Sequence, residues 1–332
     1  MAFPSHPSTR RGLTRALVAA CALCALGTAQ AQAPAPWPTK PLRVVVGFAP
    51  GGSTDVMARI LSQSLAESLG QSVVIDNKPG ASGNIAAAEV IRAAPDGHTF
   101  LIAPTSVETA NPSLFKSNIL PSRDLAPVGG VGKTQMYLVA RPQIEAKDAR
   151  ELVALAKARP GKLSYASSGA GTPPHLACEL FKLSTGTFVT HIPYRGAAPA
   201  LQDVMAGQTD FVCDPGIAFP HIRTGKVKLL GVVSAKRSPF FPDVPTVGEQ
   251  GFKDADLDIW FGMWAPRGTP PDVIARMNRE LAKALALPTT KTRYADLGAE
   301  PAPLETADFK SLLANEGTRL STLIREQKII VD

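Results

Sequence analysis

The most informative pattern in the sequence is a pair of glycine-rich loops, each placed where an apolar run meets a helical pattern. The first loop, residues 48–55, reads Phe-Ala-Pro-Gly-Gly-Ser-Thr-Asp. Its glycines let the backbone approach a ligand closely, and the free N–H groups of the following helix favour an anion such as a carboxylate. The simpler interpretation is a tight turn in which Ser53 or Thr54 caps the helix and Asp55 complements its dipole. For Asp55 we favour this second interpretation, because a carboxylate ligand avoids a second carboxylate.

A second loop, residues 167–175, repeats the arrangement with the sequence Ser-Ser-Gly-Ala-Gly-Thr-Pro-Pro-His. It follows a short strand-like run, and proline stands in the first turn of the predicted helix, where its missing N–H group costs nothing. Two helix N-termini that face each other would hold one anionic ligand between them. The loop fails as a dinucleotide-binding fingerprint, because Pro174 stands where the third glycine belongs.

Polar side chains that follow other predicted strands are candidates for contacts that discriminate among ligands. The guanidinium of Arg195 could bind a carboxylate with two hydrogen bonds, or it could simply be solvated. Asp214 could face a cleft or cap the next helix, and we favour the cap. Thr105 and Ser106 are the remaining candidates.

The sequence gives little support for catalysis or metal binding. Residues 127–134 end in Gly-Lys-Thr like a phosphate-binding loop, but Pro127 replaces the first glycine and a strand-like apolar run follows. The Gly-x-Ser-x-Gly elbow of serine hydrolases is absent from the sequence, and the histidines after the leader lack the spacing of metal ligands. We therefore expect no catalytic residue, no metal and no cofactor.

Alternating strand-like and helix-like patterns position these loops. Residues 42–103 read as strand, helix, strand, helix, strand, which predicts a doubly wound parallel sheet in an α/β fold. Residues 141–256 contain a second α/β alternation of similar size. A further strand at residues 260–265 and two or three helices within residues 271–327 have no sheet of their own, so we expect them to pack back onto the first unit.

This order predicts two domains joined by two connections. Domain 1 comprises residues 36–140 and 257–332, and domain 2 comprises residues 141–256, with crossings near residues 139–142 and 256–261. Two lobes with a hinged cleft between them are the architecture of periplasmic binding proteins, which close on a ligand by domain rotation. A chain of 332 residues also exceeds one ordinary hydrophobic core.

The N-terminus has the pattern of an export signal. Basic residues within positions 10–15 precede an apolar run at positions 16–27, and small residues end the leader at Ala31. The apolar run is too short to span a bilayer, which needs about 20 apolar residues. We expect residues 1–31 to be a signal peptide for the Sec or twin-arginine route, and the mature protein to be periplasmic. A lipoprotein cleavage box ending at Cys21 is the less favoured interpretation.

Charge and cysteine content narrow the possibilities further. Residues 1–31 contain three arginines and no acidic residue, so their removal lowers the formal charge from +7 to +4. The remaining basic residues are spread out without interleaved aromatics, which argues against binding of nucleic acid. Cys178 and Cys213 remain in the mature chain. The periplasm would permit them to pair, but we favour two buried thiols that pack as small hydrophobic groups.

Taken together and in this order, the motifs resemble those of the Bug family of solute receptors, which serve the tripartite tricarboxylate transporters. They are PGGSTD at residues 50–55, NKPGASG at 77–83, Asn111-Pro112, SGAGTPPHL at 168–176, HIPYRG at 191–196, Pro220-His221-Ile222 with Gly225-Lys226, and PDVPT at 242–246. The resemblance covers essentially all of the chain after the leader.

The resemblance implies a type II-like binding protein that holds a ligand carboxylate through backbone groups and ordered water. It also implies delivery to an inner-membrane permease with a large and a small membrane subunit. By position, it assigns ligand-binding roles to Phe48, Gly51, Gly52, Ser53 and Asp55 in the first loop, and to Ser168, Gly169, Gly171, Thr172 and His175 in the second. Family members commonly carry Phe-Asp-Asn where this chain has Cys213-Asp214-Pro215, so a polar side chain is missing on the far side of the expected cleft.

Hypotheses of different class follow from these observations. The leading hypothesis is a monomeric transport receptor without catalysis, whose ligand is a dicarboxylate, tricarboxylate, acidic amino acid or aromatic acid. A secreted enzyme acting on a carboxylic acid would need a nucleophile, a base and an orienting group in one cleft. A periplasmic sensor subunit for a carboxylate would keep the fold and change only the partner.

Overall fold

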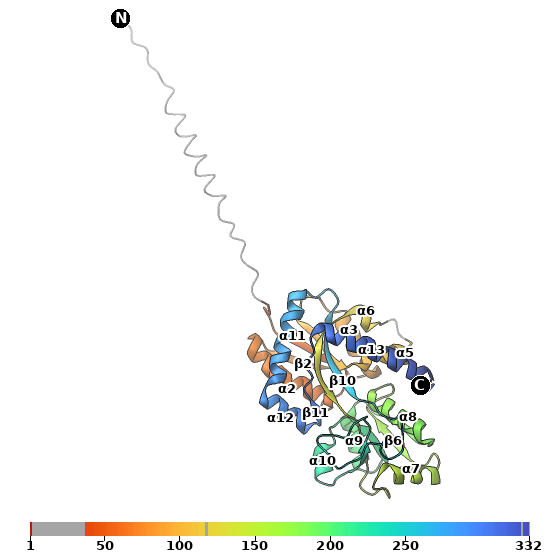
Figure 1. The fold of residues 1–332 in the computed structure, drawn as a ribbon. Helices are drawn as coiled ribbons and strands as arrows, with labels where there is room; N and C mark the ends of the chain where they lie inside the picture. The colour runs from red at the N-terminus through yellow and green to blue at the C-terminus, as the bar shows by residue number, and fades with distance from the viewer. Residues whose placement is uncertain (2–36, 117–118, 327, 332) are drawn as a thin grey trace. The chain divides into compact units, whose positions relative to one another are not determined.

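A computed structural model describes Met1 and residues 37–116, 119–326 and 328–331. The predicted signal peptide lies outside the described residues, apart from Met1. The chain from Lys40 onward forms one compact unit that contains two β-sheets (Figure 1). We call the part built on the six-stranded sheet lobe 1 and the part built on the five-stranded sheet lobe 2.

The sheet of lobe 1 has the strand order β11-β4-β10-β3-β1-β2. Strand β1 is a buried, valine-rich run that pairs in parallel with β2 and β3, as expected for a strand covered on both faces. Strand β10 lies antiparallel between β3 and β4. The strand bounds are β1 (Leu42–Val46), β2 (Val73–Asn77), β3 (Thr99–Pro104), β4 (Leu125–Thr134), β10 (Ile259–Pro266) and β11 (Ala299–Glu300).

The sheet of lobe 2 has the order β7-β6-β8-β5-β9. Strand β6 pairs in parallel with β7 and β8, and β5 lies antiparallel between β8 and β9. The strand bounds are β5 (Tyr137–Ala140), β6 (Ser164–Ser167), β7 (Thr190–Pro193), β8 (Phe211–Asp214) and β9 (Lys228–Val232).

Both sheets are mixed. The three strands predicted within residues 42–103 are parallel to one another, as expected, and antiparallel strands are added later in the chain. In each lobe, one strand is the first strand that the chain forms after it crosses from the other lobe. Strand β5 of lobe 2 follows β4 of lobe 1, and β10 of lobe 1 follows β9, the last strand of lobe 2. An inserted strand of this kind runs against its neighbours, since no crossover helix precedes it.

The predicted boundary between residues 140 and 141 needs a correction. Strand β5 (Tyr137–Ala140), which the sequence assigns to domain 1, pairs with β8 and β9 in the sheet of lobe 2. The chain therefore crosses between β4 and β5, at Gln135 and Met136. The Arg141-Pro142 pair looked like a boundary because proline punctuates chains, but it only ends β5.

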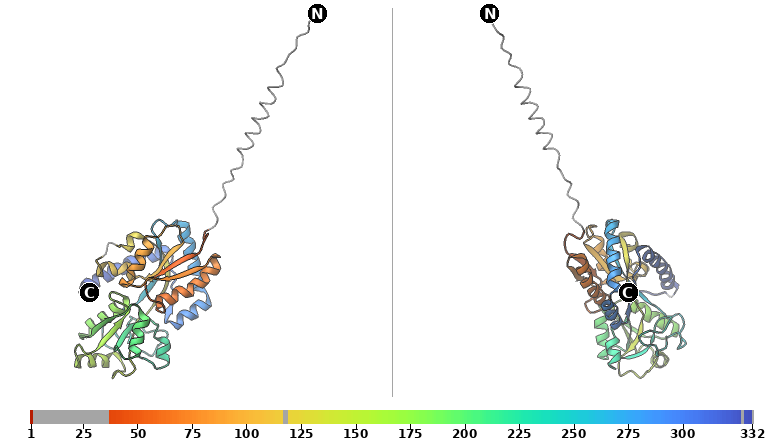
Figure 2. Two further views of the ribbon diagram at one scale, coloured as in Figure 1. Left: turned by 180° about the vertical axis from the view of Figure 1, so that it is seen from behind. Right: turned by 60° about the vertical axis from the view of Figure 1, so that its left-hand side comes forward.

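Helices cover both faces of the sheet in lobe 1, as Figure 2 also shows. Helices α3 and α13 share a buried core with Val45, Trp264 and Phe309, whereas α2 packs against α11 and α12. The C-terminal helices thus return to lobe 1, as predicted. The helix bounds are α2 (Ser53–Leu69), η1 (Ala81–Gly83), α3 (Asn84–Ile91), α4 (Ser106–Thr109), α5 (Asn111–Leu114), α6 (Pro121–Asp124), α7 (Ala149–Ala158), α8 (Pro173–Thr185), α9 (Ala197–Met205), α10 (Phe219–Arg223), α11 (Pro271–Ala286), α12 (Pro288–Asp296) and α13 (Thr306–Glu326). Within the described residues, no helix combines the length and apolar character that crossing a membrane requires.

The longest strand, β4, was not predicted, because three glycines interrupt its apolar pattern. These glycines are required by close packing. A Cβ at Gly129 would lie 2.3 Å from Asn278 Nδ2, one at Gly130 would lie 2.6 Å from the Ala302 carbonyl, and one at Gly132 would lie 2.9 Å from the Tyr294 ring. Glycine in a strand interior marks such a close approach of other chain segments.

Lobe 2 contains a disulfide between Cys178 of α8 and Cys213 of β8. The favoured prediction of two free buried thiols is therefore wrong. Both residues are fully buried, as that prediction required, but α8 packs directly on β8 and places the two sulfur atoms in contact. Sequence spacing could not show this, because the residues are 35 positions apart.

Candidate functional site

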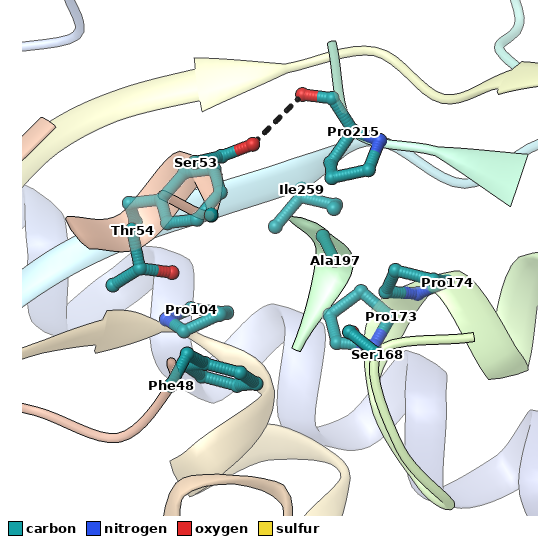
Figure 3. Close-up of a pocket in the computed structure, with 12 residues that line it drawn as sticks. Phe48, Ser53, Thr54, Pro104, Ser168, Pro173, Pro174, Ala197, Pro215 and Ile259 are labelled. Atoms are coloured by element: carbon teal, nitrogen blue, oxygen red, sulfur yellow. Dashed lines mark hydrogen bonds between the residues drawn. The ribbon is translucent and has the colours of Figure 1, made fainter. Parts of the chain in front are cut away.

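A small cavity of about 30 Å³ lies between the two lobes, where the first turn of α2 approaches the start of α8 (Figure 3). We call it the inner cavity. Its size corresponds to about two water molecules. Its lining comprises Phe48, Gly52, Ser53, Thr54, Pro104, Ser168, Pro173, Pro174, Ala197, Pro215, Ile259 and Phe261.

The first loop presents the N-terminus of α2 to the inner cavity. Gly52 caps the helix in an extended conformation, and the first helical hydrogen bond runs from the Val56 N–H to the Gly52 carbonyl. The N–H groups of Ser53 and Thr54 therefore have no acceptor within the helix. Together with the positive end of the helix dipole, they form a site that favours an anion.

Asp55 fastens this loop rather than lining the cavity. Its carboxylate accepts hydrogen bonds from the Gly51 N–H at 2.9 Å, from Arg59 Nε at 3.0 Å and from Asn77 Nδ2 at 2.9 Å. Burial opposes ionisation of Asp55, but the hydrogen bonds from Arg59, Gly51 and Asn77 outweigh it and lower the pKa of the carboxyl group. Gly51, at φ +85°, adopts the left-handed conformation that the turn needs. Its N–H group is engaged by Asp55 and is not directed at a ligand.

The two lobes also touch across the inner cavity. Ser53 Oγ donates a hydrogen bond to the Pro215 carbonyl at 3.3 Å (Figure 3). This bond links the first helical residue of α2 to the segment that follows β8. The hydroxyl predicted to contact the ligand thus already has an acceptor in lobe 2.

The second loop offers fewer donors than the first. Thr172 caps α8, and Pro173 and Pro174 occupy its first two positions, where neither has an N–H group. The Thr172 hydroxyl and N–H both donate to the Gly169 carbonyl, at 2.7 Å and 3.2 Å. Ser168 is the residue of this loop that lines the cavity beside the prolines. The expected symmetry between two anion-binding helix N-termini is therefore not present.

Two histidines support the second loop from behind. His175 Nδ1 accepts a hydrogen bond from the Gly171 N–H at 3.2 Å. His191 Nε2 shares a hydrogen bond of 2.6 Å with the Ser167 hydroxyl, whose oxygen also accepts from the Gly169 N–H. The two imidazole rings stack with their centroids 4.3 Å apart. His175 is buried and lines neither cavity, and its hydrogen bond to Gly171 links it to the loop.

Both imidazoles are neutral at pH 7. Burial lowers the pKa of His175, and burial together with repulsion from His175 lowers the pKa of His191 to about 4. A neutral ring is what an accepting Nδ1 requires. On the far side, the Tyr165 hydroxyl donates to Glu179, which also accepts from Lys182 at 2.7 Å. The sequence did not reveal this cluster, since Tyr165 and His191 become neighbours only through the pairing of β6 with β7.

A larger outer cavity of about 470 Å³ adjoins the inner one, since Phe48 and Ser168 line both. Arg195 is the one charged residue among the described residues of its lining, and its side chain is exposed. Ser82 contributes a buried hydroxyl oxygen that has no hydrogen-bond partner among the described residues. The rest of the lining comprises Gly47, Pro79, Gly80, Ala81, Ile85, Phe115, Gly169, Ala170, Pro193 and Tyr194.

Three further predicted ligand contacts, besides Gly51, Asp55, Gly171, Thr172 and His175, lie away from both cavities. Asp214 is buried and accepts hydrogen bonds from the Gly216 and Ala218 N–H groups at 2.7 Å and 2.9 Å, so it holds the turn that leads into α10. It is not the cap that we expected, since the N-cap residue of α10 is Ala218 and has no side-chain capping bond. Burial raises its pKa to about 6. Thr105 is buried and donates to Glu316 at 2.7 Å, and Ser106 is buried beside it. Pro104, directly before them, lines the inner cavity instead.

Sequence reasoning missed most of the apolar wall of the inner cavity. The missed residues are Pro104, Pro173, Pro174, Ala197, Pro215, Ile259 and Phe261, together with the polar Thr54. Most of them begin a helix or end a strand, which is where ligands bind in α/β sheets. A search limited to polar side chains passed over them.

The side chains that line the inner cavity are apolar or carry hydroxyl groups. None of the described residues that line it carries an ionisable side chain. Among the described residues, no group of histidine, cysteine and acidic side chains is placed to hold a metal ion. The available chemistry consists of backbone donors, three hydroxyl groups and apolar contacts.

Comparison with known proteins places the chain in a family. Residues 57–329 match the family model described as the tripartite tricarboxylate transporter family receptor, TctC. The chain belongs to this receptor family. BugT from Bordetella pertussis is 36% identical over 298 residues, which are 87% of this chain and 90% of BugT.

Two solved receptor structures share the fold. MatC from Rhodopseudomonas palustris, with bound malate, is 34% identical with a TM-score of 0.83, over 87% of this chain and 100% of MatC. Rpa4515 from R. palustris, with adipate, is 33% identical with a TM-score of 0.85, over 89% of this chain and 99% of Rpa4515. The resemblance to the Bug receptors and the two-lobed binding-protein fold are thereby confirmed.

Proposed function

We propose that this receptor binds a small carboxylate between its lobes in the periplasm and hands it to a membrane permease of the tripartite type. The observation that carries the proposal is the inner cavity, in which the uncapped first turn of α2 faces Ser168 of lobe 2. The carboxylate contacts that we propose are Gly52, Ser53, Thr54 and Ser168, with Phe48 against the body of the ligand.

The groups that line the inner cavity favour binding of one singly charged anionic group at the N-terminus of α2. The N-terminus of a helix carries about half a positive charge and several free donors, and carboxylates bind there without a cationic side chain. Malate and adipate are bound in the two related structures. Gly51, Asp55, Gly169, Gly171, Thr172 and His175 act in this proposal through the shape of the two loops.

The proposed role is transport without turnover. The family consists of receptors, and the inner cavity lacks an ionisable side chain that could act as a general acid or base. The predicted leader at residues 1–31 supports a periplasmic location. The permease with its two membrane subunits is proposed on the basis of family membership.

A thermal-shift screen of carboxylic acids tests the proposal. A ligand that binds only the folded protein and is present at 100 times its Kd adds about 2.7 kcal/mol to stability, which raises Tm by several degrees in a protein of this size. The matched control for each acid is its primary amide, which keeps the shape and lacks the charge. We expect acids to raise Tm and amides to leave it unchanged. Equal shifts for acid and amide, or no shift with any acid, would contradict a carboxylate receptor.

A further inference from the structure

The walls around the proposed carboxylate site are almost entirely hydrocarbon. Phe48, Ile259 and Phe261 are buried in lobe 1, with 8%, 3% and 2% of their surfaces exposed. Lobe 2 adds three prolines and one alanine, which Figure 3 shows around the same space. No described residue of this lining carries a cation. A second carboxylate on a carbon close to the first would therefore lose its hydration without gaining a partner, which is strongly unfavourable.

The arginine next to the first loop does not change this conclusion. Arg59 is bound to Asp55 through Nε and donates to Asn77 Oδ1 through Nη2 at 3.1 Å. Its charge is balanced within lobe 1, and Arg59 lines neither the inner nor the outer cavity. The inner cavity thus has donors for one anionic group.

The outer cavity differs from the inner one because its lining includes a cation. Arg195 has no acidic partner among the described residues, and its guanidinium can form two parallel hydrogen bonds to a carboxylate. The same lining includes Ile85, which is 50% exposed, and the aromatic ring of Phe115. The body of a ligand that passes Phe48 would cover these apolar groups and bring its far end toward Arg195.

We infer that the receptor prefers a carboxylate whose neighbouring carbons are uncharged, and accepts a second carboxylate only at the end of a chain long enough to reach Arg195. This inference rests on the proposed carboxylate function. It predicts that short dicarboxylates are poor ligands, whereas monocarboxylates with an apolar body and longer dicarboxylates are good ones.

Two matched pairs of acids test the inference by titration calorimetry of the mature protein. Butyrate and succinate have four carbons each, and hexanoate and adipate have six, so each pair differs by one carboxylate at fixed length. We expect butyrate to bind about tenfold more tightly than succinate. Adipate should bind at least as tightly as hexanoate, because its second carboxylate gains Arg195.

Variants separate the contribution of Arg195 from general electrostatics. Arg195→Ala should weaken adipate about tenfold more than it weakens hexanoate. Arg293→Ala removes an exposed arginine of α12 outside both cavities and should leave the adipate-to-hexanoate ratio unchanged. Succinate binding as tightly as butyrate, or equal losses for adipate and hexanoate in Arg195→Ala, would overturn the inference while leaving the carboxylate receptor intact. Binding of none of the four acids would overturn the inference, whereas the carboxylate function itself would be overturned only if no acid of the thermal-shift screen raised Tm.

Discussion

The two glycine-rich loops, residues 48–55 and 167–175, are held in place by different chemistry. In each, the third helical residue accepts a hydrogen bond from the N–H of the residue before the N-cap: Asp55 from Gly51, and His175 from Gly171. In lobe 1 the acceptor is a carboxylate held by Arg59. In lobe 2 the acceptor is a neutral imidazole stacked on a second histidine.

The difference explains why one loop can attract an anion and the other can only shape the space around it. The charge of Asp55 is balanced by its arginine partner, and α2 keeps its free N–H groups. Helix α8 starts with two prolines and lacks the equivalent donors. A charged acceptor beside those prolines would repel the ligand without compensation, so a neutral histidine suits lobe 2. We call Asp55 and His175, with its partner His191, the anchors of the two loops. We expect their removal to change the stability of the protein in different ways.

Removal of the charged anchor should have the largest effect on stability. Asp55→Ala leaves the Gly51 N–H without its acceptor, removes one of the two acceptors of Asn77 Nδ2 and breaks the ion pair with Arg59. Hydrogen bonds to a charged group contribute about 1.5–3 kcal/mol, so we expect the free energy of unfolding to fall by about 2–3 kcal/mol. Urea denaturation measures the change. The control is Glu67→Ala at an exposed position of the same helix, and an equally small loss in both variants would contradict the anchoring role.

The neutral histidines should make the stability of the protein depend on pH. The pKa of His191 is lowered to about 4 in the folded protein, so the unfolded chain binds its proton first as the pH falls below about 6.5. Protonation of His191 in the unfolded chain therefore lowers the free energy of unfolding on acidification, by about 2 kcal/mol between pH 7 and pH 5. In His191→Gln, whose side chain does not titrate, the free energy of unfolding should fall between the two pH values by about 2 kcal/mol less than in the unmodified protein. The raised pKa of Asp214 acts in the opposite direction, but it is common to both proteins and cancels. Parallel pH profiles would contradict a neutral His191.

The smallest effect concerns the ligand face of the first loop. Gly52 has φ −78° and ψ 164°, which any residue can adopt, and a Cβ there would lie 3.7 Å from the nearest atom, the Ala49 carbonyl oxygen. Gly52→Val should therefore fold normally while its methyl groups occupy the inner cavity. We expect at least a tenfold loss of carboxylate affinity, or about 1.4 kcal/mol, with an unchanged circular dichroism spectrum. Gln63→Val, at an exposed position of α2, is the control. Unchanged affinity in Gly52→Val would place the carboxylate elsewhere.

Sequence reasoning located the elements that carry strong periodic patterns. The strand predicted at residues 72–76 is β2 (Val73–Asn77), and the helix predicted at residues 148–159 is α7 (Ala149–Ala158). The failures have physical causes. Strand β4 was missed because it contains three glycines, which allow other segments to pack against its backbone. Strand β5 was assigned to the wrong lobe because a short apolar run does not reveal which strands it will pair with.

The candidate site was predictable only in part, for a similar reason. The loops at residues 48–55 and 167–175 were found because glycines between a strand and a helix indicate a tight turn that a ligand can approach closely. The hydrogen bond between Ser167 and His191 depends on the pairing of β6 with β7, which local sequence does not encode. The proline-rich wall of the inner cavity was missed because prolines at helix starts also have an ordinary structural explanation.

The position of β10 has a consequence for how the chain assembles. All five strands of lobe 2 lie within residues 137–232, whereas lobe 1 needs β10 (Ile259–Pro266) between β3 and β4. As the polypeptide emerges from its N-terminus, the sheet of lobe 2 can therefore be complete while the sheet of lobe 1 still lacks a middle strand. Until β10 arrives, β3 and β4 each expose an unpaired edge, the kind of surface that promotes aggregation. The lobe that begins first is thus the lobe that finishes last.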